Sequence, residues 1–370
     1  MIRVLVLNAG SSSLKWTVLG ADAALVAGAD EAWTSANDAD RTEQLRAALR
    51  RAPRFDVVGH RIVHGGPRFR AAVAIDDSVR GALERLKHLD PEHMAPALAG
   101  IDAVRTAFPA LPQIAAFDTA FHATLPDAAS GYALPFEWTE RWDLRRFGFH
   151  GLSVAYAVER TSELLGETPR HLVVCHLGSG CSITAVADGR SVDTTMGFSP
   201  LEGLMMATRS GSVDPGLLLY LEEHCGLSTG ELREALTHRS GLLGVSGVSN
   251  DLRKVLAAAE SGSTRARLAY DRFVLSARRA LGAMTGALGG VDAVVFTGGI
   301  GENSGEIRRD VARALAFAGL ELDASLDANK SDRVVSAAGS RVRVLVIRSR
   351  EDLAILKEVL RVRGAASGVS

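Results

Sequence analysis

The sequence has few cysteines, no excess of charge and no long apolar run. Cys175, Cys181 and Cys225 are the only cysteines among 370 residues, and this small odd number is expected of a reduced, cytoplasmic protein. The net charge of −1 gives no electrostatic reason to expect nucleic acid or an anionic membrane as a partner. No apolar run approaches the roughly 18 residues that cross a bilayer, and the chain opens on a predicted strand rather than on a secretory signal. An anionic ligand must therefore be bound by a few placed cations.

The composition is that of a globular protein. Apolar residues make up 47% of the chain and charged residues 23%, and 370 residues are enough for two domains with proper cores. The neighbouring Cys175, His176 and Cys181 fit no zinc-ligand spacing, so ordinary strand and turn positions are the simpler interpretation.

Two stretches repeat one plan. Residues 1–20 and 170–189 each have an apolar β-branched run, a turn of small residues and a second alternating run, which predicts a β-hairpin. Glycine lets the backbone approach an anion, and free N–H groups and serine hydroxyls can bind phosphate. Either hairpin alone could be purely structural. Asn8 and Lys15, which flank the first turn, favour two related domains that hold one polyphosphate.

Two charged residues belong to predicted buried strands. Arg61 lies in the apolar run 55–66, and burying an unpaired arginine is costly. It is therefore either an edge-strand residue in water or a cation directed at an anionic ligand. The strand 113–117 runs into Asp118, and ligands of open α/β sheets bind beyond the carboxyl ends of strands. Asp118 is thus a candidate for metal or acid/base work, with helix capping as the alternative.

Further candidates lie in glycine-rich segments. His150 follows two phenylalanines in RRFGFHG, before a predicted helix that ends near Gly166, and a structural histidine is the alternative there. Arg209 lies in the glycine- and proline-punctuated segment 197–216, a type of segment that often lines sites.

The last third of the chain holds two more candidate segments. Residues 250–253 are expected at a helix start, where capping alone would explain them. Residues 291–304 predict a strand, a Gly-Gly-Ile-Gly turn and a helix start. This segment lacks the downstream acid of a dinucleotide fingerprint and suits a nucleoside surface better.

Several helices are expected from apolar spacing and capping residues. The predicted ranges are 41–51, 76–89 with Ser78 as N-cap, 92–107, and 264–288, followed by a last strand and a final helix that starts at Glu351 and Asp352.

Taken together, the motifs resemble those of the acetate kinases, within the acetate and sugar kinase, Hsp70 and actin superfamily. The resemblance runs from Ile2 to about Leu360, in the expected order. The motifs are NAGSSSLK, HRIVHGG, FDTAFH, RRFGFHG, CHLGSG, GFSPLEG, TRSGSVDPG, GVSGVSND and FTGGIGENS.

The resemblance implies an α/β fold of two duplicated, RNase H-like domains of the actin-like ATPase type, with a cleft between them. The expected N-terminal domain is 1–120, completed by a helix at 353–363, and the expected nucleotide-binding domain is 121–352. A homodimer is also implied.

The implied activity is reversible phosphorylation of acetate by ATP, giving acetyl phosphate and ADP by direct in-line transfer, with Mg²⁺ as cofactor and Mn²⁺ as its alternative. Three alternatives remain open: a kinase of propionate or another short carboxylate, a non-catalytic ATP clamp of the actin or Hsp70 type, and a sugar kinase. The last would need Asp118 as a base for a hydroxyl, and two arginines would then face a neutral sugar.

The resemblance assigns roles to individual residues. Asp118, Arg61, Arg209 and His150 are implied to act on the transferring phosphoryl group and the carboxylate, and Asn8 and Glu351 are implied on the magnesium side. The acyl pocket is implied to contain Arg61, Val63, Leu89, Phe149 and Pro200. The implied ATP-binding residues are Ser11, Ser13, Lys15, His176, Gly178, Ser179, Gly180, Asp251, Arg253, Gly299, Ile300 and Asn303.

Three stretches depart from the family pattern. Ser179 stands where asparagine is usual, LKHLDPEHM at 86–94 replaces an LAPLHNPPN-like stretch, and RSRED at 348–352 replaces TNEE. These departures bear on the phosphate turn, on acyl specificity and on the metal side, respectively.

Overall fold

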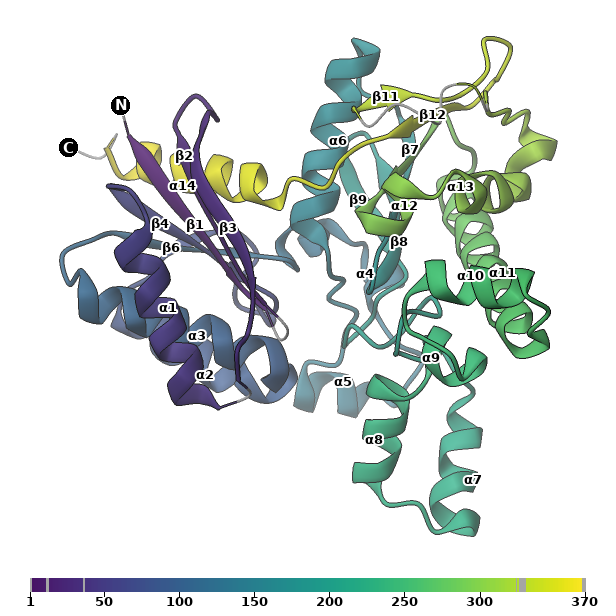
Figure 1. Ribbon diagram of the computed structural model, residues 1–370, viewed down its shortest axis with the longest axis horizontal. Helices are drawn as coiled ribbons and strands as arrows, with labels where there is room; N and C mark the ends of the chain where they lie inside the picture. Colours follow the sequence, from purple (N-terminus) through teal and green to yellow (C-terminus); the bar gives the residue numbers. More distant parts are fainter. Residues whose placement is uncertain (1, 11–12, 36, 324, 326–330, 368–370) are drawn as a thin grey trace. The chain divides into compact units, whose positions relative to one another are not determined.

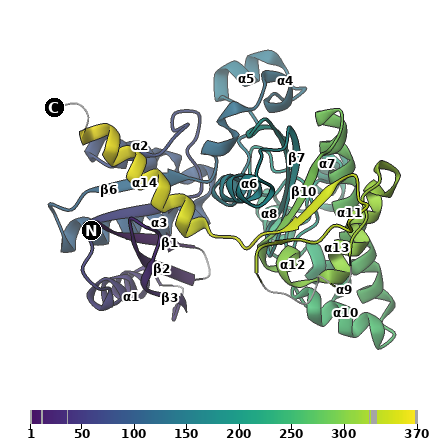
Figure 2. The same cartoon turned by 90° about the horizontal axis from the view of Figure 1, so that it is seen from above.

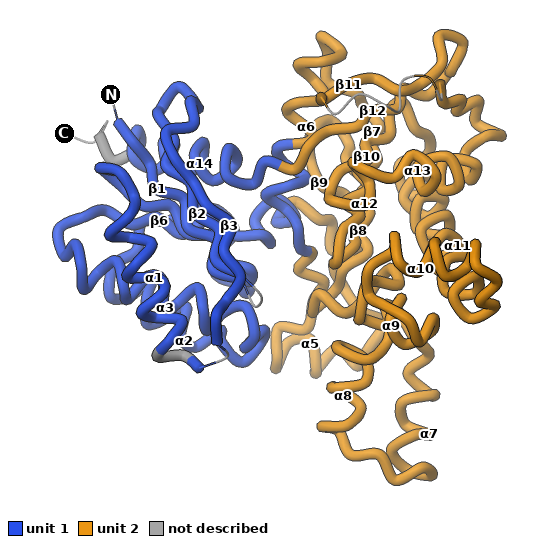
Figure 3. The backbone as a smooth tube through the Cα atoms, in the orientation of Figure 1, with its two compact units in different colours: residues 1–123, 149–156, 350–370 blue, residues 124–148, 157–349 orange. Residues whose placement is uncertain are grey.

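The computed structural model describes residues 2–10, 13–35, 37–323, 325 and 331–367. The chain forms two compact units (Figure 3). Unit 1 comprises residues 1–123, 149–156 and 350–370, and unit 2 comprises residues 124–148 and 157–349. The domain boundaries expected from the sequence stay a prediction, because duplicated domains are defined by ancestry and these units by contacts.

Unit 1 is built on a six-stranded sheet with the order β3-β2-β1-β4-β6-β5. β1 pairs antiparallel with β2 and parallel with β4, and β4 pairs parallel with β6. The predicted first hairpin is therefore confirmed. The strands are β1 Arg3–Ala9, β2 Ser13–Gly20, β3 Leu25–Ala32, β4 Val57–Ile62, β5 Val73–Ala74 and β6 Gln113–Phe117.

Unit 2 repeats this plan with the order β11-β12-β10-β7-β8-β9. Here too a three-stranded antiparallel meander is followed by two parallel strands, and a short antiparallel strand closes the far edge. The two sheets thus share one topology, the duplication that the paired hairpins predict. The strands are β7 His171–Leu177, β8 Cys181–Ala187, β9 Arg190–Thr194, β10 Ala293–Thr297, β11 Arg333–Val334 and β12 Arg343–Val346.

Helices cover both faces of the sheet in unit 1 (Figure 2). Side chains alternate along β1, so Leu5 and Leu7 pack with α1 and α3, whereas Val4 and Val6 pack with α14. The helical segments of this unit are α1 Asp38–Arg51, α2 Asp77–Leu86, η1 Lys87–Leu89, α3 Pro91–Ala107, η2 Ala120–Thr124 and α14 Glu351–Ser367.

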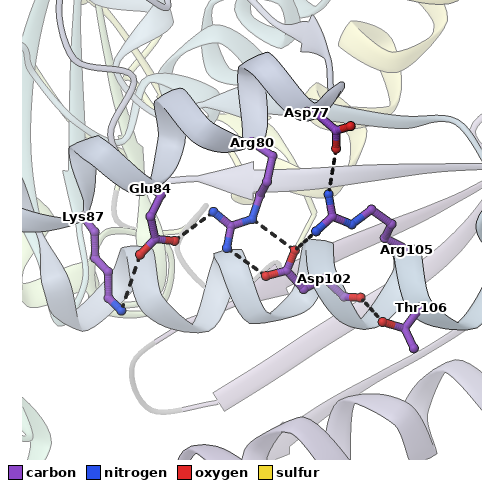
Figure 4. A network of polar contacts seen from close by, with 7 residues as sticks. All are labelled: Asp77, Arg80, Glu84, Lys87, Asp102, Arg105 and Thr106. Carbon is purple, nitrogen blue, oxygen red and sulfur yellow. Dashed lines mark hydrogen bonds and ion pairs between the residues drawn. The ribbon is translucent and has the colours of Figure 1, made fainter.

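The start of α2 differs from the prediction. The N-cap is Asp76, whose carboxylate accepts a hydrogen bond from Val79 N at 2.7 Å, so the assignment of Ser78 was wrong. A run of ion pairs then joins α2 to α3 (Figure 4). Arg80 is its centre, since it contacts Asp102 at 2.7 Å and Glu84 at 2.8 Å.

Unit 2 contains most of the described helices, and Figure 1 shows them in colours from blue-teal at α4 to yellow-green at α13. The long helix α11 has the predicted limits and buries Tyr270, Phe273, Ala277 and Leu281 along one face. The remaining helices are α4 Asp127–Ser130, α5 Phe136–Trp142, α6 Gly151–Leu165, α7 Pro215–Cys225, α8 Thr229–His238, α9 Gly241–Ser246, α10 Leu252–Glu260, α11 Thr264–Leu288, α12 Gly298–Asn303, α13 Gly305–Ala312 and η3 Arg313–Ala318; α6 begins in unit 1.

Within the described part of the chain, none of the helices is both long and apolar enough to cross a membrane. No group of three or more His, Cys, Asp or Glu side chains there could hold a metal ion. Cys175 and Cys181 are buried.

Candidate functional site

The carboxyl ends of β4 and β6 bring Arg61 and Asp118 together. Arg61 Nε donates to Asp118 Oδ1 at 3.2 Å, and Arg61 Nη2 forms an ion pair with Asp118 Oδ2. β4 lies between β1 and β6, so the alternative of a solvated edge-strand arginine was wrong. The side chain of Arg61 is only 15% exposed and that of Asp118 only 1%. A buried guanidinium is held here by a buried carboxylate.

Two more polar side chains complete this cluster. Asn8, near the end of β1, accepts a hydrogen bond from Arg61 Nη1 at 3.2 Å through Oδ1. Glu351, the first residue of α14, lies 3.5 Å from Arg61 Nε and accepts from Asn8 Nδ2 at 3.5 Å. Four residues from distant parts of the sequence thus meet at the carboxyl ends of the strands β1, β4 and β6.

The electrostatics of the cluster follow from burial. The pKa of the Asp118 carboxyl is raised to about 6, and desolvation by burial is the largest cause. The charge of Arg61 lowers this pKa, whereas the charge of Glu351 raises it further. Burial acts to lower the pKa of Arg61, but the charges of Asp118 and Glu351 outweigh it and raise that pKa above its usual value. Arg61 therefore stays a cation.

The segment Phe149–Gly151 is anchored beside Asp118. Gly151 N donates to Asp118 O at 2.8 Å, and a Cβ at Gly151 would lie only 2.2 Å from that oxygen, so only glycine fits there. His122 Nε2 contacts Phe149 O at 3.0 Å. His150 has a φ of 59°, in the left-handed region. Because both neighbours of His150 are held by hydrogen bonds, the backbone of His150 is fixed close to that of Asp118.

Apart from Arg61, the predicted acyl-pocket residues of unit 1 are apolar and at least half-buried. Val63 is 7% exposed and Phe149 1%. Phe149 packs edge-on against the ring of His64, with centroids 5.4 Å apart. Leu89, at the end of η1, is half-buried.

Arg209 and Pro200 belong to unit 2 and contact each other. Arg209 Nη1 donates to Pro200 O at 3.2 Å. The same segment is tied to the β7–β8 turn, because Ala207 N donates to Ser179 O at 3.1 Å.

A pocket of about 490 Å³ lies in unit 2. It brings together seven of the predicted ATP-binding residues, from the β7–β8 turn, the start of α10 and helix α12. The lining residues are Gly178, Ser179, Asn250, Asp251, Leu252, Arg253, Leu256, Gly299, Ile300, Asn303 and Ser304.

Local structure explains two parts of this pocket. Asp251 is the N-cap of α10 and also binds the Arg253 side chain, at 3.0 and 2.6 Å. Gly298, the first residue of α12, has a φ of 76°, and a Cβ there would approach Leu177 O to 2.7 Å. Glycine is required at 298 by both conformation and space.

The other predicted ATP-binding residues lie elsewhere. Lys15 forms an exposed ion pair with Asp30 on β3 at 3.0 Å, and it pairs across the hairpin with Asn8. Ser13 is the first residue of β2, and Ser11 lies outside the described residues. His176, near the end of β7, and Gly180, in the β7–β8 turn, are not among the residues that line the pocket.

Comparisons with known proteins show which family the chain belongs to. The sequence model of the Acetokinase family matches residues 40–357. The chain belongs to the acetokinase family. It is 50% identical to the acetate kinase of Nostoc punctiforme over 308 residues, which cover 82% of this chain and 76% of the relative.

Solved structures of acetokinase-family proteins share the whole fold. The Porphyromonas gingivalis acetate kinase superposes with a TM-score of 0.89 at 33% identity, covering 98% of this chain and 100% of that one. A propionate kinase from Francisella tularensis gives a TM-score of 0.89 at 34% identity, covering 97% and 99%. The duplicated α/β architecture is therefore that of the family.

The sequence analysis did not assign some of the residues that line the pocket of unit 2. Leu252 and Leu256 line it from successive turns of α10, and their spacing of four was a usable signal. Ser304 is the N-cap of α13 and could have been noticed only through that role. Asn250 had been noted as part of a helix start, without a pocket role.

Proposed function

We propose that this chain is an acetate kinase, which transfers the γ-phosphoryl group of ATP to acetate and forms acetyl phosphate and ADP reversibly. The observation that carries the proposal is the buried Arg61, held by Asp118, Asn8 and Glu351 in a member of the acetokinase family. An arginine fork suits a carboxylate or a phosphoryl group, because its N–H groups bind two oxygens at once.

The chemistry makes few demands on the protein. A short carboxylic acid has a pKa of roughly 4 to 5 and is ionised at pH 7, so no general base is needed. The acetate oxygen attacks the γ-phosphorus in line, a new P–O bond forms, and the bond to the ADP oxygen breaks. Catalysis then consists of orienting two anions and neutralising charge on the transferring group.

Four residues would supply that work. We assign Arg61 and Arg209 to the carboxylate and the transferring phosphoryl group, and His150 to the charge that develops in the transition state. Asp118, with its raised pKa, orients Arg61 through the paired contacts described above. Arg209 is itself oriented by the carbonyl of Pro200.

The residues present fit Mg²⁺, or Mn²⁺. Asn8, Asp118 and Glu351 offer amide and carboxylate oxygens within one cluster, the donors that Mg²⁺ uses together with substrate phosphates. A bound ion would neutralise phosphate charge. The same oxygens contact Arg61.

The 490 Å³ pocket of unit 2 is assigned to the nucleoside part of ATP. Its glycine-lined rim and its apolar Ile300, Leu252 and Leu256 suit a base and a sugar better than a highly charged group. Lys15 and Ser13, from the first hairpin, are assigned to phosphate oxygens. Binding there requires Lys15 to exchange its exposed Asp30 partner, which costs little because surface ion pairs are weak.

Acyl specificity is assigned to Val63, Leu89, Phe149 and Pro200. The bulk of Val63 favours acetate over propionate, although one methylene is worth only about 1–3 kcal/mol. The similarity to a Francisella tularensis propionate kinase makes propionate the second candidate. A homodimer is proposed as the working form, which light scattering of the purified protein would test.

The reverse reaction tests the proposal. Purified protein with MgADP and acetyl phosphate should form ATP, measured by luciferase, and should do so more efficiently than with propionyl phosphate. A preference for propionyl phosphate would reassign the substrate. ATP binding without ATP synthesis from either acyl phosphate would refute the enzyme and leave a non-catalytic clamp.

A further inference from the structure

Between β9 and α7 the chain runs through residues 195–214 without a helix or a strand. The hydrogen bonds of a helix or a sheet therefore do not fix its shape, and side chains must do so instead. Its first part, residues 195–203, contains Pro200, and we call it the Pro200 loop. The Pro200 carbonyl accepts a hydrogen bond from Arg209 Nη1 at 3.2 Å. The shape of the Pro200 loop thus bears on a side chain that the proposed function assigns to the substrate.

The hydroxyl group of Tyr132 joins the two sides of the Pro200 loop. It accepts a hydrogen bond from Phe198 N at 2.8 Å and donates one to Glu202 Oε2 at 2.6 Å. The first of these partners precedes Pro200 and the second follows it. One side chain from outside the loop therefore closes it around Pro200, because a hydroxyl can accept and donate at the same time.

Arg146 closes the Pro200 loop a second time. Its Nη2 donates to Glu202 Oε1 at 2.9 Å, and its Nη1 donates to Thr195 O at 3.2 Å. The guanidinium also lies over the Tyr132 ring, 5.6 Å from the ring centroid. Each oxygen of the Glu202 carboxylate is thus bound by a different side chain, and each of those side chains also binds the backbone on the other side of Pro200.

The Pro200 loop is packed closely around this carboxylate and phenol. A Cβ at Gly197 would lie 1.7 Å from Glu202 Oε2 and 2.1 Å from Tyr132 Oη, so no side chain fits there. Gly197 O accepts a hydrogen bond from Phe147 N at 3.1 Å. Burial and the neighbouring Glu202 raise the pKa of Tyr132 to about 12, so the phenol keeps its proton and stays a donor.

Stabilisation of the fold alone is the simplest role of such a network. Arg146 can serve that role, because it also donates to Ala129 O at 3.3 Å and so holds the preceding segment. The Tyr132 hydroxyl and the Glu202 carboxylate instead meet across Pro200, the residue whose carbonyl contacts Arg209. These two groups are therefore placed to control where that carbonyl lies.

We propose that Tyr132 and Glu202 are positioning residues, which set the place of the Pro200 carbonyl and thereby direct Arg209 toward the carboxylate of the substrate. This inference rests on the proposed acetate kinase function. A small misplacement of a group that binds a reacting anion is costly, so loss of either contact should weaken acetate binding. ATP binding should be spared, because neither residue lines the 490 Å³ pocket assigned to the nucleoside.

Tyr132→Phe tests the proposal most sharply, since it removes one oxygen and keeps the ring beside Arg146. Hydroxamate formation gives KM for acetate and KM for ATP in wild type, Tyr132→Phe and Glu202→Gln, and thermal unfolding checks that each variant is folded. Tyr270→Phe is the matched control. Tyr270 also donates to a carboxylate, Asp310 Oδ2 at 2.5 Å, but this hydrogen bond joins α11 to α13.

We expect KM for acetate to rise about 10-fold in Tyr132→Phe, because Phe198 N and Glu202 lose their shared partner, while KM for ATP stays within about twofold of wild type. Glu202→Gln should also raise KM for acetate, because an amide offers one acceptor oxygen to two donors, and it covers the case in which Tyr132→Phe does not fold. Tyr270→Phe should lower Tm and leave both KM values within about twofold of wild type.

A KM for acetate within about twofold of wild type in either folded variant, or equal rises in KM for both substrates, would overturn the proposal, because the network would then serve only the fold. Turnover of acetate by wild type in the same assay decides the proposed function separately. Acetate activity with unchanged KM values in the variants refutes only the positioning role. No hydroxamate from wild type refutes the proposed function and this inference with it.

Discussion

Arg61 and Asp118 form a two-pronged ion pair across the adjacent parallel strands β4 and β6, with Asp118 almost fully buried. Breaking a buried pair leaves an uncompensated charge, which is costly, while the pair itself is only weak evidence for stability. Its position at the carboxyl ends of central strands indicates function instead.

Arg61→Ala is expected to lower kcat by about 10³, because a positioned arginine contributes that much to phosphoryl transfer. Arg61→Lys should recover little, since lysine keeps the charge but not the fork that contacts both Asp118 oxygens. Steady-state kinetics with an exposed control, Arg50→Ala, measure the effect. Near-normal kcat in Arg61→Ala would contradict the assigned role.

Two adjacent glycines allow effects on binding and on folding to be distinguished at the proposed nucleotide pocket. No atom lies within 4 Å of a Cβ placed on Gly299, so Gly299→Ala should fold normally while its methyl group enters the pocket and raises KM for ATP about 10-fold. Gly298→Ala should instead lower Tm, because the φ of 76° and the backbone of Leu177 leave no room for a side chain. An unchanged KM for ATP in Gly299→Ala would show that ATP binds elsewhere.

Arg308, in α13, is expected to position α12, which lines the proposed nucleotide pocket. Its side chain is 2% exposed, and Nη1 donates to the carbonyls of Gly301 and Glu302 at 2.7 and 2.9 Å. Arg308→Met fills similar space without donors, so we expect KM for ATP to rise about 10-fold and KM for acetate to stay constant. The control is Arg309→Met, because Arg309 is an exposed residue of α13, the helix that also contains Arg308. A lower Tm with unchanged KM for ATP would mean that Arg308 is purely structural.

Stability should fall in mild acid. Burial lowers the pKa of His60 and of His122 from 6.5 to about 4, so the unfolded chain binds protons that the folded chain refuses. Each histidine contributes stability that is complete above pH 6.5 and lost toward pH 4, about 3 kcal/mol per residue. Asp118 acts in the opposite sense, since its raised pKa favours the folded state at low pH, but one carboxyl opposes two histidines.

Urea unfolding between pH 7 and pH 4.5 measures this effect. His60→Asn should show a smaller loss of unfolding free energy over that range than wild type. Equal losses in both proteins would mean that His60 does not resist protonation.

Much of the fold could be predicted from local patterns. The limits of α11 follow from apolar residues three and four apart between Ser263 and Gly289, and both hairpins follow from glycine turns between alternating strands. The N-cap of α2 was misplaced because Asp76, Asp77 and Ser78 are all good caps, and only the geometry selects Asp76.

The site was harder to predict from the sequence than the fold. Arg61 lies on a central strand because of the order of the strands in the sheet, and that order cannot be read from the sequence of a single strand. Asn8 and Glu351 are separated by 343 positions, so their contact needs the completed unit.

The most direct measurement is hydroxylamine trapping of acyl phosphate with Mg-ATP and acetate, run in parallel on wild type, Arg61→Ala and Arg209→Ala, with ATP binding measured for each. The account predicts acetate-dependent hydroxamate from wild type and its loss in both variants while they still bind ATP. Hydroxamate at wild-type levels from either variant, or none from wild type with bound ATP, would contradict it.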